Sequence, residues 1–544
     1  MGFNVCFLVF LIRLLLLPVT FGSNMEQTTI VIDGEHRIAE IDENFVCATL
    51  DWWPPEKCNY DQCPWGYASL INLNLSSPLL AKAIQAFKTL RIRLGGSLQD
   101  QVIYDVGDLK TPCSPFKKTD DGLFGFSKGC LYMDRWNELN RFFNSTGAIV
   151  TFGLNALYGR DKLSGNSWGG DWDHINTQDF MNYTVSMGYA IDSWEFGNEL
   201  SGSGIDASVS VELYGKDLIV LKDVIKNVYK NSQTKPLLLA PGGFYDEKWY
   251  SELLRLSGPG VLDVMTHHIY NLGPVNLAGN DPQLENRILD PKYLSGISGK
   301  FKNVDQTIQE HGPWAAAWVG EAGGASNSGG RQVSETFINS FWYLDQLGMS
   351  SMHNTKVYCR QALVGGFYGL LEKETFVPNP DYYSALLWHR LMGKGVLGVQ
   401  TNASEYLRTY VHCSKGTAGI TILLINLSKQ TTFTVGVSNG VKVILQAEPM
   451  KRKSFLETIK SKVSWVGNKA SDGYLNREEY HLSPKDGNLR SKIMLLNGIP
   501  LEPTITGDIP KLEPIRHGVK SPVYINPLSI SFIVLPTFDA PACS

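Results

Sequence analysis

The sequence predicts an α/β fold, in which a (β/α)8 TIM barrel is followed by a C-terminal antiparallel β-sandwich domain that also takes the N-terminal strands. Buried strand patterns alternate with amphipathic helix patterns eight times between residues 43 and 392, and short alternating strands replace helical periodicity from about residue 393. Eight βα units in succession favour a closed parallel barrel over an open doubly wound sheet. A length of 544 residues suits two folded units.

The first 23 residues are typical of a secretory signal peptide, because an apolar run precedes small residues at Thr20 and Gly22. Arg13 interrupts that run and Pro18 follows it closely, so a membrane-spanning signal anchor is the less favoured interpretation. We expect cleavage near Gly22 or Ser23.

Residues 24–42 are predicted to form strands that join the second domain. A strand at 28–32 is expected to turn at Asp33-Gly34 and to continue to residue 41. These strands precede the first barrel strand and have no partner in the barrel. The chain should therefore begin and end in the same β domain.

The barrel, residues 43–392, is built from strand patterns followed by helix patterns. In the first helix, Ser77 is the expected N-cap, Pro78 lies in the first turn, and Leu80, Ile84 and Phe87 share one face. The predicted strands are 45–50, 91–94, 148–152, 193–196, 237–240, 264–268, 317–320 and 357–361. The predicted helices are 78–90, 133–143, 177–187, 209–228, 248–256, 303–310, 334–347 and 380–392.

Residues 393–544 show short period-two strand patterns, which are typical of an antiparallel β-sandwich. The predicted strands of this domain are 407–412, 419–426, 431–437, 441–446, 493–496 and 528–535.

Composition limits the partners of this chain. The 49 basic and 53 acidic residues give a net charge of −4, which is too balanced to attract nucleic acid or an anionic membrane by charge alone. An acidic substrate would have to be recognised locally. Because no Cys-x-x-Cys pair occurs, a zinc site has little support, and we expect no metal and no cofactor.

Eight cysteines remain after signal cleavage, and an even number in an oxidising compartment favours disulfides. The close pairs Cys58/Cys63 and Cys113/Cys130 fall in loops, where a covalent link would restrain the backbone. Cys47 and Cys359 fall in buried strands and are candidates for inert thiols. Five N-glycosylation sequons fit the secretory pathway, at Asn74, Asn144, Asn182, Asn402 and Asn426.

Two glutamates end strands that face each other across the predicted barrel. Glu199 follows the fourth strand and Glu321 follows the seventh, at the carboxyl-terminal mouth where barrel active sites lie. Retaining glycoside hydrolysis needs two carboxyl groups about 5–5.5 Å apart, one as nucleophile and one as acid/base. Asn198 can hold a sugar 2-hydroxyl. A lone glutamate near glycine is usually a solvated loop acid, and Glu195, which lies inside the strand, is better suited to a buried polar network or the pocket floor.

The residues around these glutamates resemble the heparanase and β-glucuronidase family of retaining glycosidases, and most of all its plant heparanase-like members. The resemblance covers nearly the whole mature chain. It rests on Trp194-Glu195-Phe196-Gly197-Asn198-Glu199-Leu200, Thr266-His267-His268-Ile269-Tyr270-Asn271, Val319-Gly320-Glu321, Thr49-Leu50-Asp51, Leu94-Gly95-Gly96-Ser97, Phe152-Gly153-Leu154-Asn155-Ala156-Leu157, Arg360-Gln361 and Pro380-Asp381-Tyr382.

The resemblance implies roles for individual residues. Glu199 would be the acid/base, Glu321 the nucleophile, and Asn198 the partner of the 2-hydroxyl. It also implies substrate contacts from the side chains or backbone of Asp51, Ser97, Gln361, Gly366 and Tyr368, of which Gly366 and Tyr368 match a motif that binds the uronic carboxylate. It further implies a disulfide between Cys413 and Cys543. Region 104–132 is short where animal heparanases carry an excised linker, which implies an active single chain.

Two further groups of residues have open interpretations. His267 and His268 must point to opposite faces of their strand, so if His268 and Tyr270 face the mouth, Tyr270 can hydrogen-bond Glu321. A structural histidine is the usual alternative, and Ile269 replaces an aromatic of animal relatives. Loop tryptophans could stack on a sugar, although core packing is more frequent for tryptophan. These are Trp52, Trp53, Trp65 and Trp168.

The sequence thus predicts a secreted β-glucuronidase, placed in the cell wall or alternatively in a lysosome or vacuole. Its partner would be a glucuronic-acid-capped glycan, a proteoglycan side chain or a small-molecule glucuronide. An endo-acting heparanase-like enzyme, a related arabinofuranosidase or β-glucosidase, and a catalytically silent carbohydrate-binding relative are the alternatives. The choice of natural substrate, exo or endo action and oligomeric state stay open.

Overall fold

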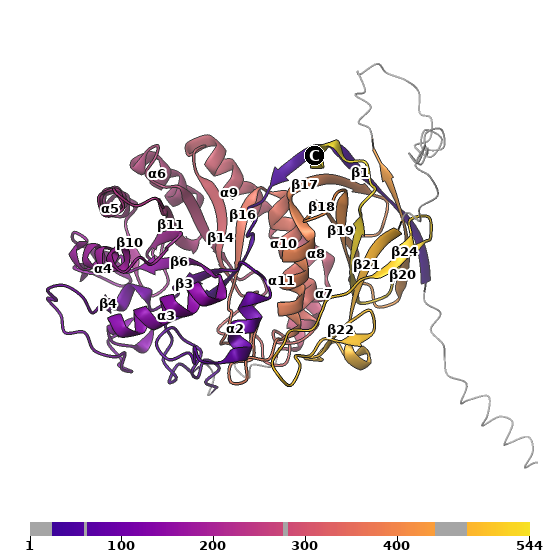
Figure 1. Ribbon diagram of the computed structural model, residues 1–544. Coiled ribbons are helices and arrows are strands. Elements are labelled where there is room, and N and C mark those ends of the chain that lie inside the picture. Colours follow the sequence, from indigo (N-terminus) through magenta and orange to yellow (C-terminus); the bar gives the residue numbers. More distant parts are fainter. Residues whose placement is uncertain (1–23, 59–61, 276–280, 441–475) are drawn as a thin grey trace, which may run out of the picture.

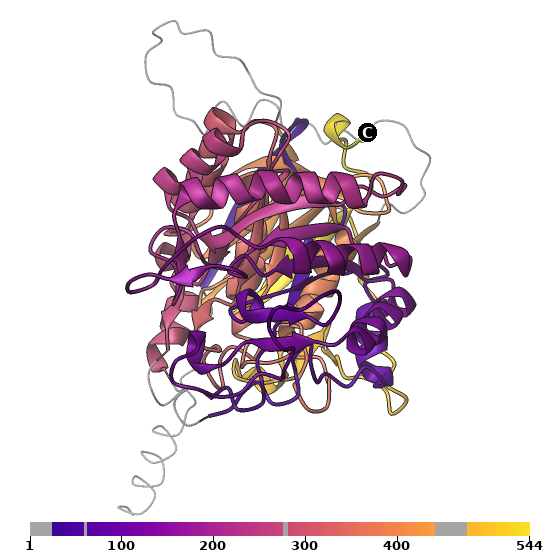
Figure 2. The same ribbon diagram turned by 90° about the vertical axis from the view of Figure 1, so that its left-hand side faces the viewer.

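The computed structural model describes residues 24–58, 62–275, 281–440 and 476–544. The predicted signal peptide and the predicted strand at 441–446 lie outside these residues. Figure 1 shows a barrel surrounded by helices on one side and a large β-sheet on the other. Figure 2 views the barrel from its own side, with the orange and yellow strands of the sheet behind it.

Eight parallel strands close the barrel in the order β11-β12-β14-β16-β2-β3-β6-β9. All eight were predicted, and pairing between β16 and β2 closes the circle. The strands are β2 (Val46–Leu50), β3 (Arg91–Leu94), β6 (Ile149–Leu154), β9 (Ser193–Phe196), β11 (Leu237–Phe244), β12 (Val264–Ile269), β14 (Ala316–Ala322) and β16 (Thr355–Arg360).

The eight predicted helices are present, with ends set by local caps. The side chain of Ser77 accepts a hydrogen bond from Leu80 N at the start of α2, and Asp246 caps α6 through Trp249 N. These helices are α2 (Pro78–Gln85), α3 (Met133–Thr146), α4 (Ile175–Ser186), α5 (Val211–Val228), α6 (Glu247–Ser257), α9 (Ser298–His311), α10 (Asn339–Met352) and α11 (Pro380–Leu391).

Two short helices were not predicted. They are α7 (Pro282–Leu289) and α8 (Pro291–Ser295), and each begins with an aspartate cap, Asp281 or Asp290, followed by proline. The repeated Asp-Pro pair is a helix-start signal that could have revealed both.

The loops at the barrel mouth carry short strands of their own. β4 (Val102–Tyr104) pairs with β5 (Gly129–Leu131), and β8 (Ser167–Gly169) lies between β7 (Asp161–Lys162) and β10 (Ser208–Val209). β13 (Gly273–Pro274) pairs with β15 (Ala325–Ser326). The expected loop disulfides, Cys58–Cys63 and Cys113–Cys130, are both formed.

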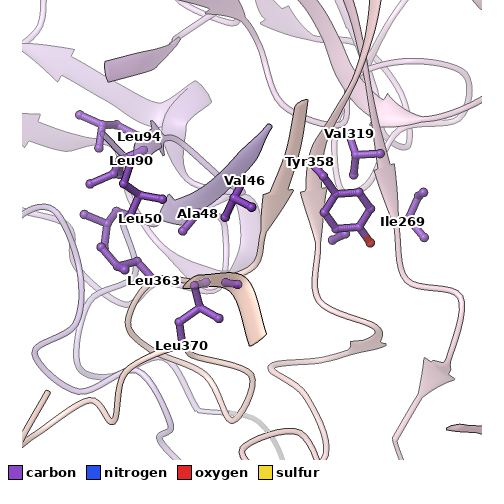
Figure 3. Close-up of a cluster of buried hydrophobic side chains, with 14 of the residues drawn as sticks. Val46, Ala48, Leu50, Leu90, Leu94, Ile269, Val319, Tyr358, Leu363 and Leu370 are labelled. Carbon is purple, nitrogen blue, oxygen red and sulfur yellow. The ribbon is translucent and has the colours of Figure 1, made fainter. Parts of the chain in front are cut away.

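Barrel side chains alternate between two environments. Val46, Ala48 and Leu50 of β2 belong to the large apolar cluster that packs strands against helices, and Figure 3 shows them beside Leu90 and Leu94. A small apolar cluster fills the interior of the barrel at the end opposite to the mouth. It consists of Cys47, Leu239, Val264, Trp318, Val357 and Cys359.

Cys47 and Cys359 form a disulfide, so their interpretation as inert thiols was wrong. They lie opposite each other on β2 and β16, the neighbouring strands that close the barrel. The predicted barrel closure makes these strands neighbours, but the sequence pattern did not show that the two cysteines lie at the same level across them. The bond therefore joins the first and the last barrel strand.

The second domain is one sheet whose strands curl over a core of their own. Among its described ladders, all are antiparallel except that between β1 and β20, which is parallel and corrects the expectation of a purely antiparallel domain. The strands are β1 (Asn24–Glu40), β17 (Met392–Thr401), β18 (Leu407–Ser414), β19 (Ile420–Asn426), β20 (Thr431–Asn439), β21 (Asn476–Pro484), β22 (Met494–Leu496), β23 (Ile499–Pro500), β24 (Ile515–Gly518), β25 (Val523–Ile525) and β26 (Ser529–Leu535).

The N-terminal segment lies in this sheet, between β17 and β20. It does not turn at Asp33-Gly34 as predicted. β1 continues past this point as one strand, and its pairing with β17 shifts register between Ile32 and Arg37 and again between Arg37 and Ala39. A bulge of this kind accommodates extra residues, here including Asp33 and Gly34, without reversing the direction of the chain.

Helices α10 and α11 lie between the barrel and the sheet (Figure 1), and almost every residue of each is buried. The Cys413–Cys543 disulfide ties the C-terminal tail to β18, an inner strand of the sheet between β17 and β19, as the family resemblance implied. None of the described helices is both long and apolar enough to cross a membrane.

The sequons differ in accessibility. Asn74, Asn144, Asn182 and Asn402 are exposed. Asn426 is fully buried, and its Nδ2, the atom that a glycan would occupy, donates hydrogen bonds to three backbone carbonyls. A glycan at Asn426 is therefore incompatible with this fold, which corrects that expectation.

Candidate active site

The two glutamates predicted to act together meet at the mouth of the barrel. One carboxylate oxygen of Glu199, one of Glu321 and a ring nitrogen of His268 all lie within 4.8 Å of one another. Both glutamates are buried, with 8% and 6% of their surface exposed. This spacing suits a retaining pair and is too small for an inverting pair, which leaves room for a water at about 6.5–9.5 Å.

The backbone around Glu199 is fixed in an unusual conformation. Glu199 has a φ of 56° in the left-handed region, which costs energy for a residue with a side chain. Its N–H donates to the carbonyl of Gly242 at 2.7 Å, and its own carbonyl accepts from Ile205 N at 3.0 Å. These bonds hold the strained turn at the end of β9 and aim the carboxylate at the centre of the mouth.

Both carboxylate oxygens of Glu321 accept hydrogen bonds that fix its orientation. Tyr270 Oη donates to its Oε1 at 2.5 Å, and Arg93 Nη1 donates to its Oε2 at 3.0 Å. Both oxygens are therefore fixed, and the charge has a buried cationic partner. The face shared by His268 and Tyr270 is thus the mouth-facing one, which was one of the two registers left open from sequence.

Arg93 is the functional residue that sequence reasoning missed. Its guanidinium is buried and donates to Glu195 Oε2 at 2.5 Å, to Glu321, and to Asn198 Oδ1 at 2.9 Å. One planar cation therefore connects β3, β9 and β14. The available signal was the Arg91-Ile92-Arg93-Leu94 strand, where two arginines with the same side-chain direction must face the barrel interior.

Glu195 is part of a buried polar network, as expected for a residue inside the strand. It is 0% exposed and pairs with Arg93. Glu195 is therefore closed off from solvent, and Glu199 and Glu321 are the two carboxylates that are partly exposed at the mouth.

Glu199 has the environment of a proton donor. Burial raises its pKa to about 7, and the Arg93 charge opposes that rise. His268 Nδ1 lies 2.9 Å from Glu199 Oε1, and burial lowers the pKa of His268 to about 4, so the imidazole is neutral at pH 7. A carboxyl group with a pKa near 7 can give a proton and take one back.

Asn198 presents a free donor to the site. Its Oδ1 is occupied by Arg93 and its backbone N–H donates to Asp100 Oδ2 at 2.8 Å. Its Nδ2 is buried and has no partner among the described residues. An unpaired buried donor of this kind is costly unless a ligand satisfies it, so Asn198 is equipped to donate to a substrate hydroxyl.

Asp51 and Gln361 lie together at the ends of β2 and β16. Gln361 Nε2 donates to Asp51 Oδ2 at 2.9 Å, and Thr49 Oγ1 donates to Gln361 Oε1. Asp51 Oδ1 is buried without a described partner. Burial, and next the charge of Glu321, raises the pKa of Asp51 well above its usual range. Ser97, the other expected hydroxyl contact, is half-buried in the loop after β3.

The loop after β16 places Gly366 and Tyr368 at the same mouth. Gly366 has a φ of 65°, and Tyr368 is 4% exposed. Burial raises the pKa of Tyr368 well above its usual range, and the charges of Asp51 and Glu321 contribute further to this rise. A Cβ on Gly323 would stand 2.8 Å from Tyr270 and 2.9 Å from Tyr368, so the two phenols flank that glycine.

The two basic residues of β16, Arg360 and Lys356, have partners within the protein. Arg360 is fully buried and donates to Asp381 Oδ2 and to the backbone carbonyl of Tyr368, both at 3.0 Å. Lys356 donates to the carbonyl of Glu40 and to Asn354, near the opposite end of β16. Arg360 therefore positions the Tyr368 loop, and its guanidinium, whose Nε and Nη1 have no hydrogen-bond partner among the described residues, lies over the rings of Trp342 and Tyr343.

The remaining candidates are structural. His267 is fully buried and packs against Phe301 of α9. Three of the loop tryptophans, Trp52, Trp53 and Trp65, are at most 5% exposed and pack in the core, and Trp168 is half-buried. Core packing is thus the correct interpretation for those three.

A metal ion would have to bind side chains that already have other partners. The site atoms of Glu199, His268 and Glu321 lie close enough to share an ion, but Glu321 already has the Arg93 cation and a phenol donor. A second group consists of Asp105, Cys113 and Cys130. Its cysteines are disulfide-bonded and have no thiolate to offer.

Comparison with known proteins gives a consistent result. Residues 27–348 match the model described as glycosyl hydrolase family 79, N-terminal domain. The chain is 88% identical to heparanase-like protein 2 of Arabidopsis thaliana, over all of both chains. It is 39% identical to baicalin-beta-D-glucuronidase of Scutellaria baicalensis, over 94% of this chain and 93% of the relative.

Solved structures share the fold at low identity. A 4-O-alpha-L-rhamnosyl-beta-D-glucuronidase from Fusarium oxysporum has a TM-score of 0.61 at 14% identity, covering 93% of this chain and 100% of that one. A GH51 arabinofuranosidase from Xanthomonas axonopodis pv. citri has a TM-score of 0.63 at 14% identity, covering 94% and 99%.

Proposed function

Since the chain belongs to glycosyl hydrolase family 79 and is a glycoside hydrolase, we propose that it cleaves β-glucuronides with retention of configuration. The observation that carries the proposal is the pair of buried carboxylates within 4.8 Å, one of which has a pKa raised to about 7. One group that is ionised and one that can hold a proton near neutral pH are the two requirements of a double displacement.

In the first step Glu321 attacks the anomeric carbon while Glu199 transfers its proton to the departing oxygen. The carbon–oxygen bond of the leaving group breaks as the glycosyl ester forms, and the leaving group departs as a neutral alcohol or phenol. In the second step Glu199, now a carboxylate, takes a proton from water, whose oxygen displaces Glu321. Two inversions give net retention.

The surrounding residues have distinct tasks in this scheme. Arg93 and Tyr270 hold both oxygens of Glu321, so one lone pair is directed at the sugar and the carboxylate stays ionised. Asn198 Nδ2 donates to the sugar 2-hydroxyl, a bond that strengthens as positive charge develops at the anomeric centre. Asp51 Oδ1 accepts from another hydroxyl of the same sugar.

Glucuronate recognition is assigned to the loop after β16. Tyr368 offers a phenol next to Asp51 and Glu321, and Gly366 allows a carboxylate to approach the backbone. The 39% identity to a baicalin-beta-D-glucuronidase over nearly the whole chain supports the same sugar. Neutral donors are consistent with Arg360 being occupied by Asp381.

The predicted compartment is part of the proposal. Four disulfides join the described cysteines, which is typical of proteins that fold in an oxidising compartment. Four exposed sequons and the signal-like first 23 residues support secretion to the cell wall.

A substrate panel tests the function. We expect kcat/KM to be highest for 4-methylumbelliferyl β-glucuronide, and low for the matching β-glucoside and α-arabinofuranoside. An acidic polysaccharide in the same panel distinguishes exo from endo action by whether monomer or oligomers are released. A preference for either neutral glycoside would overturn the assignment of glucuronate.

A further inference from the structure

We propose that Phe244 and Ile205 form an apolar platform for the leaving group, so that the enzyme selects glucuronides with an aromatic or otherwise apolar aglycone. The inference rests on the proposed function and concerns the side of the site that the sugar does not occupy. Both side chains are exposed, and both belong to segments that are hydrogen-bonded to the backbone of Glu199.

Phe244 is exposed where its strand is otherwise buried. Of β11, the six residues before Phe244 are buried, whereas the phenyl ring is 39% exposed. Phe244 is the last residue of the strand and pairs in register with His268. Its ring centroid lies 6.4 Å from that of His268 and 6.3 Å from that of Tyr270. The exposed ring therefore stands at the mouth, against the partners of both catalytic carboxylates.

The strand that carries Phe244 also abuts Glu199 directly. Gly242 accepts the Glu199 N–H, and a Cβ on Gly243 would stand 3.3 Å from Glu199 Cα. The two glycines allow this close approach. Phe244 follows them immediately, so its position relative to the proton donor is set by the backbone and not by a mobile loop.

Ile205 is attached to Glu199 on the other side of the same turn. Its N–H donates to the Glu199 carbonyl at 3.0 Å, and its side chain is 43% exposed. Exposed apolar residues are common singly, but here Ile205 is hydrogen-bonded to the backbone of Glu199, and Phe244 lies two residues after Gly242, which accepts the Glu199 N–H.

The position of Glu199 determines what these side chains meet. The acid/base protonates the oxygen of the departing group, so the atoms next to it in the substrate belong to the aglycone and not to the glucuronate. An apolar aglycone matches the two exposed apolar side chains beside Glu199, because a charged group packed against them would lose hydration without a polar partner from either side chain.

The test compares two leaving groups on one sugar. 4-Methylumbelliferyl and methyl β-glucuronide are assayed with wild type, Phe244→Ala, Phe244→Trp and Ile205→Ala. Since kcat/KM reports the same step for both, the ratio of the two values isolates the aglycone. We expect Phe244→Ala to lower the ratio about 10-fold, Ile205→Ala to lower it less, and Phe244→Trp to retain it. Tyr524→Ala, an exposed aromatic in the sheet domain, is the matched control.

The outcomes separate this inference from the proposed function. An unchanged ratio in Phe244→Ala, or an equal fall for both substrates, overturns the platform. Should wild type hydrolyse glucosides in place of glucuronides, the proposed function fails, and the same two leaving groups on glucose still test the platform. Thermal unfolding of each variant, which should match that of Tyr524→Ala, separates a binding defect from a folding defect.

Discussion

Replacing Arg93 by methionine should destabilise the fold and disable the site together. The change leaves the fully buried Glu195 without its cation, and it removes one donor each from Glu321 and Asn198. Removing one partner of a buried ion pair costs about 3–5 kcal/mol, because an uncompensated charge remains in the interior. Loss of the bonds to Glu321 and Asn198, each with a charged partner, should lower kcat/KM by about 100-fold.

Arg91 supplies the matched control. It lies two residues earlier on β3 with the same side-chain direction, but its partner Asp192 is 33% exposed and can be hydrated when the arginine is removed. Arg91→Met should therefore cost less stability than Arg93→Met and should leave kcat unchanged. The measurements are urea unfolding followed by tryptophan fluorescence, together with kcat/KM for an aryl glycoside.

A double variant separates charge burial from packing. Arg93→Met/Glu195→Met removes both ends of the buried pair and should recover most of the lost stability but none of the lost activity. Equal stability of Arg93→Met and wild type would refute the reasoning, as would a double variant less stable than the single one.

Three further predictions concern the acid/base, the sugar and the barrel closure. With the pKa of Glu199 raised to about 7, the protonated acid is lost as pH rises through 7, so kcat/KM should fall on the alkaline side and Glu199→Gln should abolish that limb. A limb that persists in the variant belongs to another group. Tyr368→Phe should lose about 1.5–3 kcal/mol of transition-state binding for glucuronides alone, measured as kcat/KM against the matched glucoside, and an equal loss for both would make the tyrosine structural. Removing the buried disulfide with Cys47→Ala/Cys359→Ala should cost about 2–5 kcal/mol, read from urea unfolding under non-reducing conditions; a variant as stable as wild type would contradict its role in closing the barrel.

The barrel and the meeting of Glu199 and Glu321 at its mouth were predictable because both follow from local pattern. Each barrel strand is a short apolar run, Glu321 lies next to the last residue of β14, and Glu199 lies three residues after β9. Alternation also predicts that His268 and Tyr270 share a face opposite to that of His267, whereas the structure was needed to show that this shared face looks into the mouth and that His267 packs on the helix side.

The features that the sequence did not reveal are contacts between residues that lie far apart along the chain. Arg93 joins residues more than 100 positions away, and its role appears only once β3, β9 and β14 surround one interior. The Cys47–Cys359 bond spans 312 positions and requires the barrel to be closed before it can be seen. Asn426 satisfies the sequon pattern, yet neighbouring strands bury its side chain completely.

The proposed double displacement requires Glu321 to be the nucleophile, and covalent trapping tests this directly. A 2-deoxy-2-fluoro β-glucuronide with a good leaving group slows the second step, so the glycosyl-enzyme accumulates and can be digested for peptide mass spectrometry. We predict one added fluoroglucuronosyl group per chain, located on the peptide that contains Glu321 and absent from Glu321→Gln. A label on another residue, or α-configured product from the natural sugar, would contradict the mechanism.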